Sequence, residues 1–144
     1  VDRRTANSCD ASLVRAARSA GVGSAGHFRA GSLPRRLAAD GVDVALLLSI
    51  WPEAWSLTLS ECRAAGVPVV AFDHGAIGER IAAEGGGVLV PVENGAEGIE
   101  SMLAKVLTGE VAVPPFRGGP VEPPARRAAE ERSELYRALL GVAS

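Results

Sequence analysis

Three short apolar runs, separated by segments of helical periodicity, constrain the fold of this chain more than any other feature. The runs cover residues 42–48, 67–72 and 87–90. A half-exposed strand alternates apolar and polar side chains, whereas a strand buried on both faces is apolar almost throughout. We therefore expect three strands of a parallel sheet, with residues 42–48 and 67–72 buried on both faces.

The segments around these runs are typical of helices. Predicted helices cover residues 10–20, 32–41, 56–65, 77–84 and 95–107, and residues 22–28 form at best a weak strand. Ser32 is the expected N-cap of the second helix, and Gly66 followed by Pro68 is a stop signal for the third. The alternation predicts an α/β fold, in which a Rossmann-like parallel sheet is covered by helices on both faces in three αβα layers.

The 144 residues of the chain are enough for one hydrophobic core. We expect one α/β lobe in residues 1–108, a connector rich in proline and glycine in residues 109–124, and a C-terminal helix in residues 125–144. The chain does not begin with Met, and we expect it to be a piece of a longer protein.

Charge and composition argue against several classes of function. The formal net charge is −2, so no basic face for nucleic acid is expected. No apolar run approaches the ~18 residues of a membrane-spanning helix, and we expect the protein in the cytoplasm or at the inner face of the membrane. Cys9 and Cys62 are predicted to be reduced thiols. His27 and His74 lack neighbours at ligand spacing, so no metal site is predicted.

Two glutamates flank the predicted turn between a strand and a helix. Glu53 precedes the helix and Glu61 lies two turns into it, which places them ~12 Å apart along the helix axis. This separation does not suit an acid/base pair acting on one bond. It suits a long ligand contacted at two points, with a diphosphate at the helix N-terminus between them. The loops 49–56 and 73–78 both follow predicted strands, at the sheet edge where ligands of such folds bind.

Other interpretations of these residues are open. The stretch from Thr58 to Glu61 has the spacing of a capping box, and Glu53 can be a solvated loop charge; spacing alone favours these two interpretations. His74 could contact a phosphate or sugar, or simply be solvated, with equal weight. Trp51 and Trp55 could border a sugar pocket or only pack.

The stretch DVALLLSIWPEAWSLTLSECRAAGVPVVAFDHGAIGERI, followed by GGGVLVP, resembles a known family. It is similar to the C-terminal, donor-binding domain of two-lobed (GT-B) glycosyltransferases, in particular family 4-like members that assemble bacterial surface polysaccharides. That pattern has a buried strand, Glu, seven residues, Glu, and then Ala-Ala-Gly-x-Pro-Val-Val-Ala. The residues that match it in order and spacing are Glu53, Glu61, 64–66, 68–71, Gly75 and Glu79. The resemblance spans about residues 22–107.

The resemblance implies a site for a nucleotide-diphosphate sugar such as a UDP- or GDP-sugar. Glu53 would be the catalytic residue that contacts the donor sugar, and Glu61 would bind the ribose. The other donor-binding residues would be Trp55, Ser56, Leu57, Thr58, His74 and Gly75, the first four through backbone N–H groups. The implied reaction transfers the sugar to an acceptor, with retention at the anomeric carbon, without a metal or a further cofactor.

The chain also departs from that family pattern. The first two strands of the donor lobe, its basic Arg/Lys pair and the N-terminal acceptor lobe have no counterpart before residue 22. We therefore expect a truncated donor lobe, inactive by itself, with an exposed sheet edge through which two copies could pair. The alternative function is a non-catalytic binding or assembly module built on a degenerate transferase lobe. An unrelated flavodoxin-like domain is a third interpretation.

Overall fold

The computed structural model describes residues 15–23, 29 and 31–119, and the chain divides into two units, residues 1–30 and 31–144. In the first unit, residues 15–19 are helical. The helix ends as predicted at Gly21, which has φ of +77°, and the N–H group of Val22 donates to the carbonyl oxygen of Ala17 over 2.8 Å. The predicted start of this helix, most of the weak strand at residues 22–28 and the predicted C-terminal helix lie outside the described residues.

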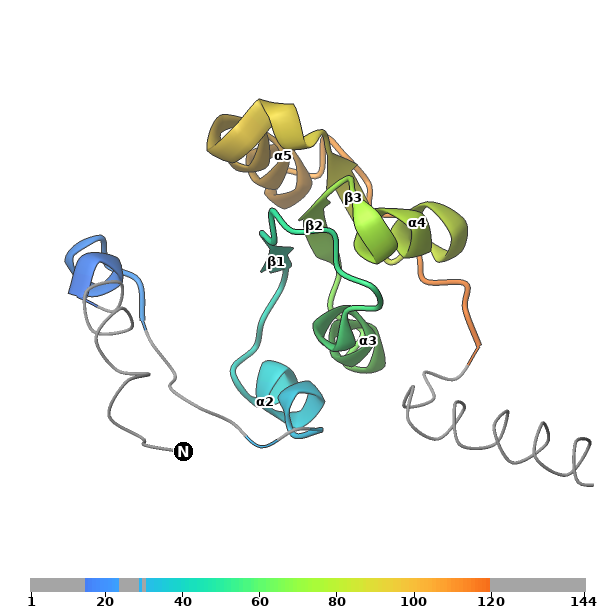
Figure 1. The fold of residues 1–144 in the computed structure, drawn as a ribbon. Coiled ribbons are helices and arrows are strands. Elements are labelled where there is room, and N and C mark those ends of the chain that lie inside the picture. The colour runs from blue at the N-terminus through green and yellow to red at the C-terminus, as the bar shows by residue number, and fades with distance from the viewer. Residues whose placement is uncertain (1–14, 24–28, 30, 120–144) are drawn as a thin grey trace, which may run out of the picture. The chain divides into compact units, whose positions relative to one another are not determined.

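The described part of the second unit is a parallel sheet between layers of helices (Figure 1). Its elements are α2 (Leu33–Ala39), β1 (Ala45–Leu47), α3 (Leu57–Ala64), β2 (Val69–Phe72), α4 (Gly75–Glu84), β3 (Gly87–Val90), the 3-10 turn η1 (Val92–Asn94) and α5 (Gly95–Leu107). The strand order is β1-β2-β3, and both strand pairs are parallel. This confirms the predicted Rossmann-like α/β fold.

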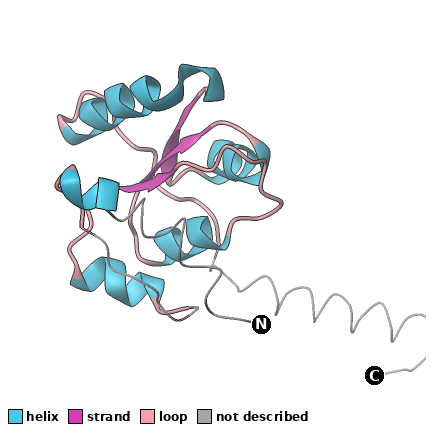
Figure 2. Cartoon of the chain, turned by 60° about the vertical axis from the view of Figure 1, so that its left-hand side comes forward, coloured by secondary structure: helices cyan, strands magenta, loops and turns pink. Residues whose placement is uncertain are grey.

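Strand β2 lies in the middle of the sheet, which has helices on both sides (Figure 2). Its side chains form the centre of the core and alternate between the two helical layers. On one face, Val69 and Ala71 pack against buried residues of α3 and α4, namely Leu59, Cys62, Ile77 and Ile81. On the other face, Val70 and Phe72 pack against Ile99 of α5. All four residues of β2 are buried, as a strand covered on both faces requires.

Strand β1 is shorter and more exposed than the sequence predicts. It covers residues 45–47 instead of 42–48, and Leu46 is 40% exposed. The prediction that this strand is buried on both faces is wrong for the described part of the chain. Within the described residues, strand β1 lies at the sheet edge and pairs on one side only, with β2, while α5 packs against β2 and β3. The apolar character of the run therefore does not translate into burial.

The helix ends follow local signals closely. Helix α3 ends before Gly66, which has φ of +71°, and the N–H group of Val67 donates to the carbonyl oxygen of Cys62 over 3.0 Å. This is the predicted glycine stop. Ser32 occupies the predicted N-cap position of α2, but its side chain makes no capping hydrogen bond. Strand β3 and helix α5 have the predicted bounds.

Candidate functional site

Two loops at the carboxyl ends of β1 and β2 lie against each other. The N–H group of Ala76 donates to the carbonyl oxygen of Glu53 over 2.9 Å, and His74 Nε2 donates to the carbonyl oxygen of Ser49 over 2.7 Å. The loops 49–56 and 73–78, which the sequence predicts at one sheet edge, are therefore joined by direct hydrogen bonds. This is the edge at which parallel sheets bind ligands.

Gly75 makes the close contact between these loops possible. It has φ of +54°, and a Cβ atom at this position would lie 2.9 Å from the Cα atom of Pro52 and 3.0 Å from the backbone N atom of Glu53. Only glycine combines this conformation with such a small volume. Helix α4 begins at Gly75, two residues before its predicted start at residue 77.

Ser56 caps the amino end of α3. Its Oγ atom accepts a hydrogen bond from the N–H group of Leu59 over 3.4 Å. Its φ of +61° makes it the one non-glycine residue with positive φ in the described part of the chain. Leu57 and Thr58 follow with exposed side chains, and the first N–H groups of a helix have no partner within it. Among the described residues, the N–H groups of residues 55–58 donate no hydrogen bond to another part of the protein, although Ser56 itself is buried.

Glu61 does not complete a capping box. The N-cap is Ser56 rather than Thr58, so Glu61 is the fifth residue of α3. Its Oε1 atom instead accepts a hydrogen bond from the N–H group of Gly31 over 3.0 Å. The capping interpretation is therefore wrong. The side chain reaches sideways from the helix to the loop before α2, and its second carboxylate oxygen is left for another donor.

Glu53 is half-buried on the loop before α3. Its backbone oxygen is used by Ala76, but among the described residues its carboxylate takes part in no hydrogen bond or ion pair. The backbone of Glu53 is fixed while the carboxylate is available to a ligand. A carboxylate in this position can accept hydrogen bonds from two neighbouring hydroxyl groups.

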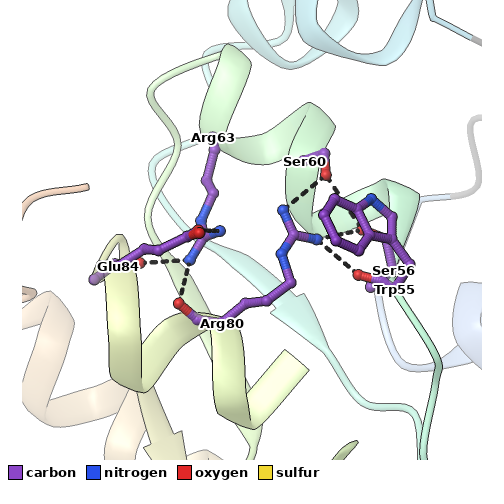
Figure 3. A network of polar contacts seen from close by, with 7 residues as sticks. Trp55, Ser56, Ser60, Arg63, Arg80 and Glu84 are labelled. Carbon is purple, nitrogen blue, oxygen red and sulfur yellow. Dashed lines mark hydrogen bonds and ion pairs between the residues drawn. The ribbon is translucent and has the colours of Figure 1, made fainter. Parts of the chain in front are cut away.

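Arg80 of α4, which sequence analysis missed, reaches across to the amino end of α3 (Figure 3). Its Nη1 atom donates to the carbonyl oxygens of Trp55 and Ser56, over 2.7 and 3.1 Å, and Nη2 donates to Ser60 Oγ over 3.0 Å. The guanidinium carbon lies 4.2 Å from the centroid of the Trp55 ring, a cation–π contact. Trp55 thus packs on Arg80, with its residue surface 40% exposed. The sequence did contain an indication of this position. Arg80 lies three residues after the buried Ile77, so both side chains lie on the same side of the helix.

Arg63 of α3, also missed, lies beside Arg80 and is almost fully buried. It forms an ion pair with Glu84 and donates from Nη2 to the carbonyl oxygens of Arg80 and Gly85, over 2.9 Å each. Its guanidinium also lies over the ring of Phe116. Burial lowers the pKa of Arg63, and the neighbouring Glu84 opposes this change. Burial, and next the charge of Arg63, lower the pKa of Arg80.

A cavity of about 390 Å³ lies away from these loops. It is lined by residues that precede β2 and β3 and by the proline segment, together with Arg63; these residues are Gly66, Val67, Pro68, Gly86 and 113–116. The cavity is therefore at the amino ends of the strands, whereas the glutamates and the two loops are at the carboxyl ends. It is a separate feature of the domain.

In the part of the chain that the structure describes, no three His, Cys, Asp or Glu side chains gather as metal ligands would. None of the described helices has the length and apolar character needed to cross a bilayer.

Comparison with known families adds to this geometry. The family model of glycosyl transferases group 1 matches residues 26–116, which is more than half of the chain. The chain belongs to this family. The glycosyl transferase match includes both glutamates, both joined loops and the two arginines, and it extends through Phe116, beyond the end of the resemblance at residue 107. Searches among curated proteins and among solved structures gave no significant match.

Proposed function

We propose that this chain is the donor-binding part of a glycosyltransferase and that it binds a nucleotide-diphosphate sugar at the carboxyl edge of its sheet. The observation that supports the proposal most directly is the open amino end of α3, with Glu53 before it and Glu61 along it. Helix N-termini favour anions because their first N–H groups are unpaired and the helix dipole is positive there. The diphosphate of the donor is the anion that fits between two acidic side chains.

Each candidate residue has a role in this proposal. The backbone N–H groups of residues 55–58 hold the diphosphate and stabilise the charge that develops on it as it leaves. Glu53 is the catalytic residue, because its carboxylate binds hydroxyl groups of the donor sugar and fixes the sugar for attack by the acceptor. Glu61 binds the ribose with the oxygen that Gly31 leaves free. His74 and Gly75 close the site from the second loop.

The finer assignment follows the sequence resemblance. We propose a family 4-like enzyme of GT-B type that works in polysaccharide biosynthesis on the cytoplasmic side of the membrane. It transfers the sugar with retention and uses no metal or cofactor besides the donor. The acceptor would bind to a separate lobe, and the chain described here would be inactive without it.

A second candidate function, an assembly module, is favoured by the exposed sheet edge. Large apolar side chains are exposed along β1 and the loop after it, namely Leu46, Leu48, Ile50 and Trp51. An unpaired edge with apolar side chains is a place where a second copy can add its own strand. Stable self-association in light scattering, together with no effect of nucleotide on thermal unfolding, would favour this function over donor binding.

Calorimetric titration of the chain with UDP and with GDP tests the donor-binding function. We expect one of the two to bind, and Glu61→Ala to weaken binding at least about tenfold, since a charge-assisted hydrogen bond to the ribose is lost. Glu100→Ala, on an exposed position of α5, is the matched control and should bind like the unchanged chain. If Glu61→Ala binds as tightly as the control, Glu61 has no such role. If neither nucleotide binds the unchanged chain, the proposed function is wrong.

A further inference from the structure

One side chain, Arg80, forms hydrogen bonds to the turn that precedes α3. It is bonded to two successive carbonyl groups, those of Trp55 and Ser56, and to the hydroxyl group of Ser60. In a planar trans peptide the N–H group points opposite to the carbonyl group of the same unit. With the two carbonyl groups directed at Arg80, the N–H groups of Ser56 and Leu57 point to the opposite side.

This geometry matters because Ser56 is in an unfavourable backbone conformation. A φ of +61° is uncommon for any residue other than glycine and persists where the surroundings enforce it. Arg80 holds Ser56 in this conformation. Its guanidinium group bonds the carbonyl groups of Trp55 and Ser56, and it also packs on the Trp55 ring (Figure 3).

Arg80 takes part in no ion pair within the described residues. The neighbouring Arg63 pairs with Glu84. That carboxylate is bonded to Arg63, while the hydrogen-bond partners of Arg80 are uncharged oxygens. Both guanidinium groups stay protonated at neutral pH. The positive charge of Arg80 therefore lies beside the amino end of α3 without a carboxylate bonded to it among the described residues.

We propose that Arg80 is a positioning residue for the donor diphosphate. It directs the N–H groups of Ser56 and Leu57 to the anion, and its positive charge lies beside them. Arg80 acts through the backbone of the turn and does not touch the reacting atoms. This inference rests on the proposed donor-binding function.

The test uses the whole chain and compares three variants of arginine. Arg80→Met removes the charge and the fork but keeps an apolar stem, Arg80→Lys keeps the charge without the fork, and Arg35→Met makes the same change at an exposed position of α2. Binding is followed by NMR titration with whichever of UDP and GDP the unchanged chain binds, and with the corresponding nucleoside. The nucleoside carries no phosphate, so it reports on a purely structural effect.

Arg80→Met should weaken binding of the diphosphate at least about tenfold and change binding of the nucleoside less than about twofold. Arg80→Lys should be intermediate, because an ammonium group cannot bond two carbonyl groups in a planar fork. The amide signals of Ser56 and Leu57 should shift in both variants, and Arg35→Met should behave like the unchanged chain.

Four results would overturn the inference. Equal diphosphate affinity in the Arg80 and Arg35 variants would remove the role of Arg80 and leave the donor-binding function intact. An equal loss for diphosphate and nucleoside would make Arg80 merely structural. Failure of the unchanged chain to bind either diphosphate would end both proposals. If Arg80→Met does not fold, Arg80→Lys decides, and full diphosphate affinity in that variant counts against the inference.

Discussion

Replacement of Gly75 by alanine would place a Cβ atom against the backbone of the loop before α3. That atom would lie 2.9 Å from the Cα atom of Pro52 and 3.0 and 3.1 Å from the N and O atoms of Glu53. The positive φ costs an L-residue about 1–2 kcal/mol, and displacing backbone atoms from such contacts costs about 1–3 kcal/mol more. We expect Gly75→Ala to lower the free energy of unfolding by about 2–5 kcal/mol, out of a typical total of about 5–15 kcal/mol.

Gly95 provides the matched control for this change. It is the first residue of α5, as Gly75 is of α4, and has nearly the same φ, +53° against +54°, but no atom lies within 4 Å of an added Cβ. Gly95 has ψ of −149°, which L-residues also avoid, so Gly95→Ala measures a backbone cost of about 1–3 kcal/mol without a contact. Urea unfolding followed by circular dichroism gives both values. Equal losses for the two variants would show that the contact with the Pro52–Glu53 backbone is not tight, and the reasoning about the joined loops would fail.

Three further predictions concern burial and charge. Burial raises the pKa of Cys62 from 9.0 to about 11, and the negative charge of Glu61 adds to this effect. The folded state therefore keeps a thiol proton that the unfolded state releases. The free energy of unfolding should fall between pH 9 and 11 by up to about 3 kcal/mol. Urea unfolding of a Cys9→Ser chain at a series of pH values would show this fall in the free energy of unfolding, and adding Cys62→Ala should remove it. Arg63→Met should lower the free energy of unfolding by about 2–4 kcal/mol, since it leaves a carboxylate and two carbonyl groups unpaired; a change below about 0.5 kcal/mol in urea unfolding would contradict the network. Leu46→Ala, at the exposed edge, should cost under about 1 kcal/mol and Val70→Ala in the core about 2 kcal/mol, and thermal unfolding that ranks them the other way would contradict the assigned burial.

The elements that the sequence predicts well depend on local chemistry. Glycine stops, short apolar runs and one-sided helical periodicity gave the bounds of β3 and α5 and the end of α3. The burial of β1 was mispredicted because burial depends on which strands and helices lie beside it, and a run of leucines does not specify neighbours. The same limit applies to Gly75, because its close approach to a loop more than twenty residues earlier has no local signal in the sequence.

The candidate site was likewise predicted from the sequence only in part. The sequence placed the two loops at one sheet edge, because strand direction and connection length fix that position. The capping box at Thr58 was mispredicted because Ser56 takes the N-cap position, and Glu61 finds its partner thirty residues away at Gly31. The arginines were missed since their partners come from separate elements, and only the packing of α3 on α4 brings them together.

The hydrogen bond between His74 and Ser49 determines which tautomer of the imidazole the site presents. A carbonyl oxygen can only accept, so the proton of a neutral ring is on Nε2. The remaining nitrogen, Nδ1, then offers a lone pair, which suits a hydroxyl group of a sugar and disfavours a phosphate oxygen. In the donor site that we propose, Nδ1 of a neutral His74 would accept a hydrogen bond from a sugar hydroxyl group, whereas an ionised phosphate oxygen has no proton to donate to it.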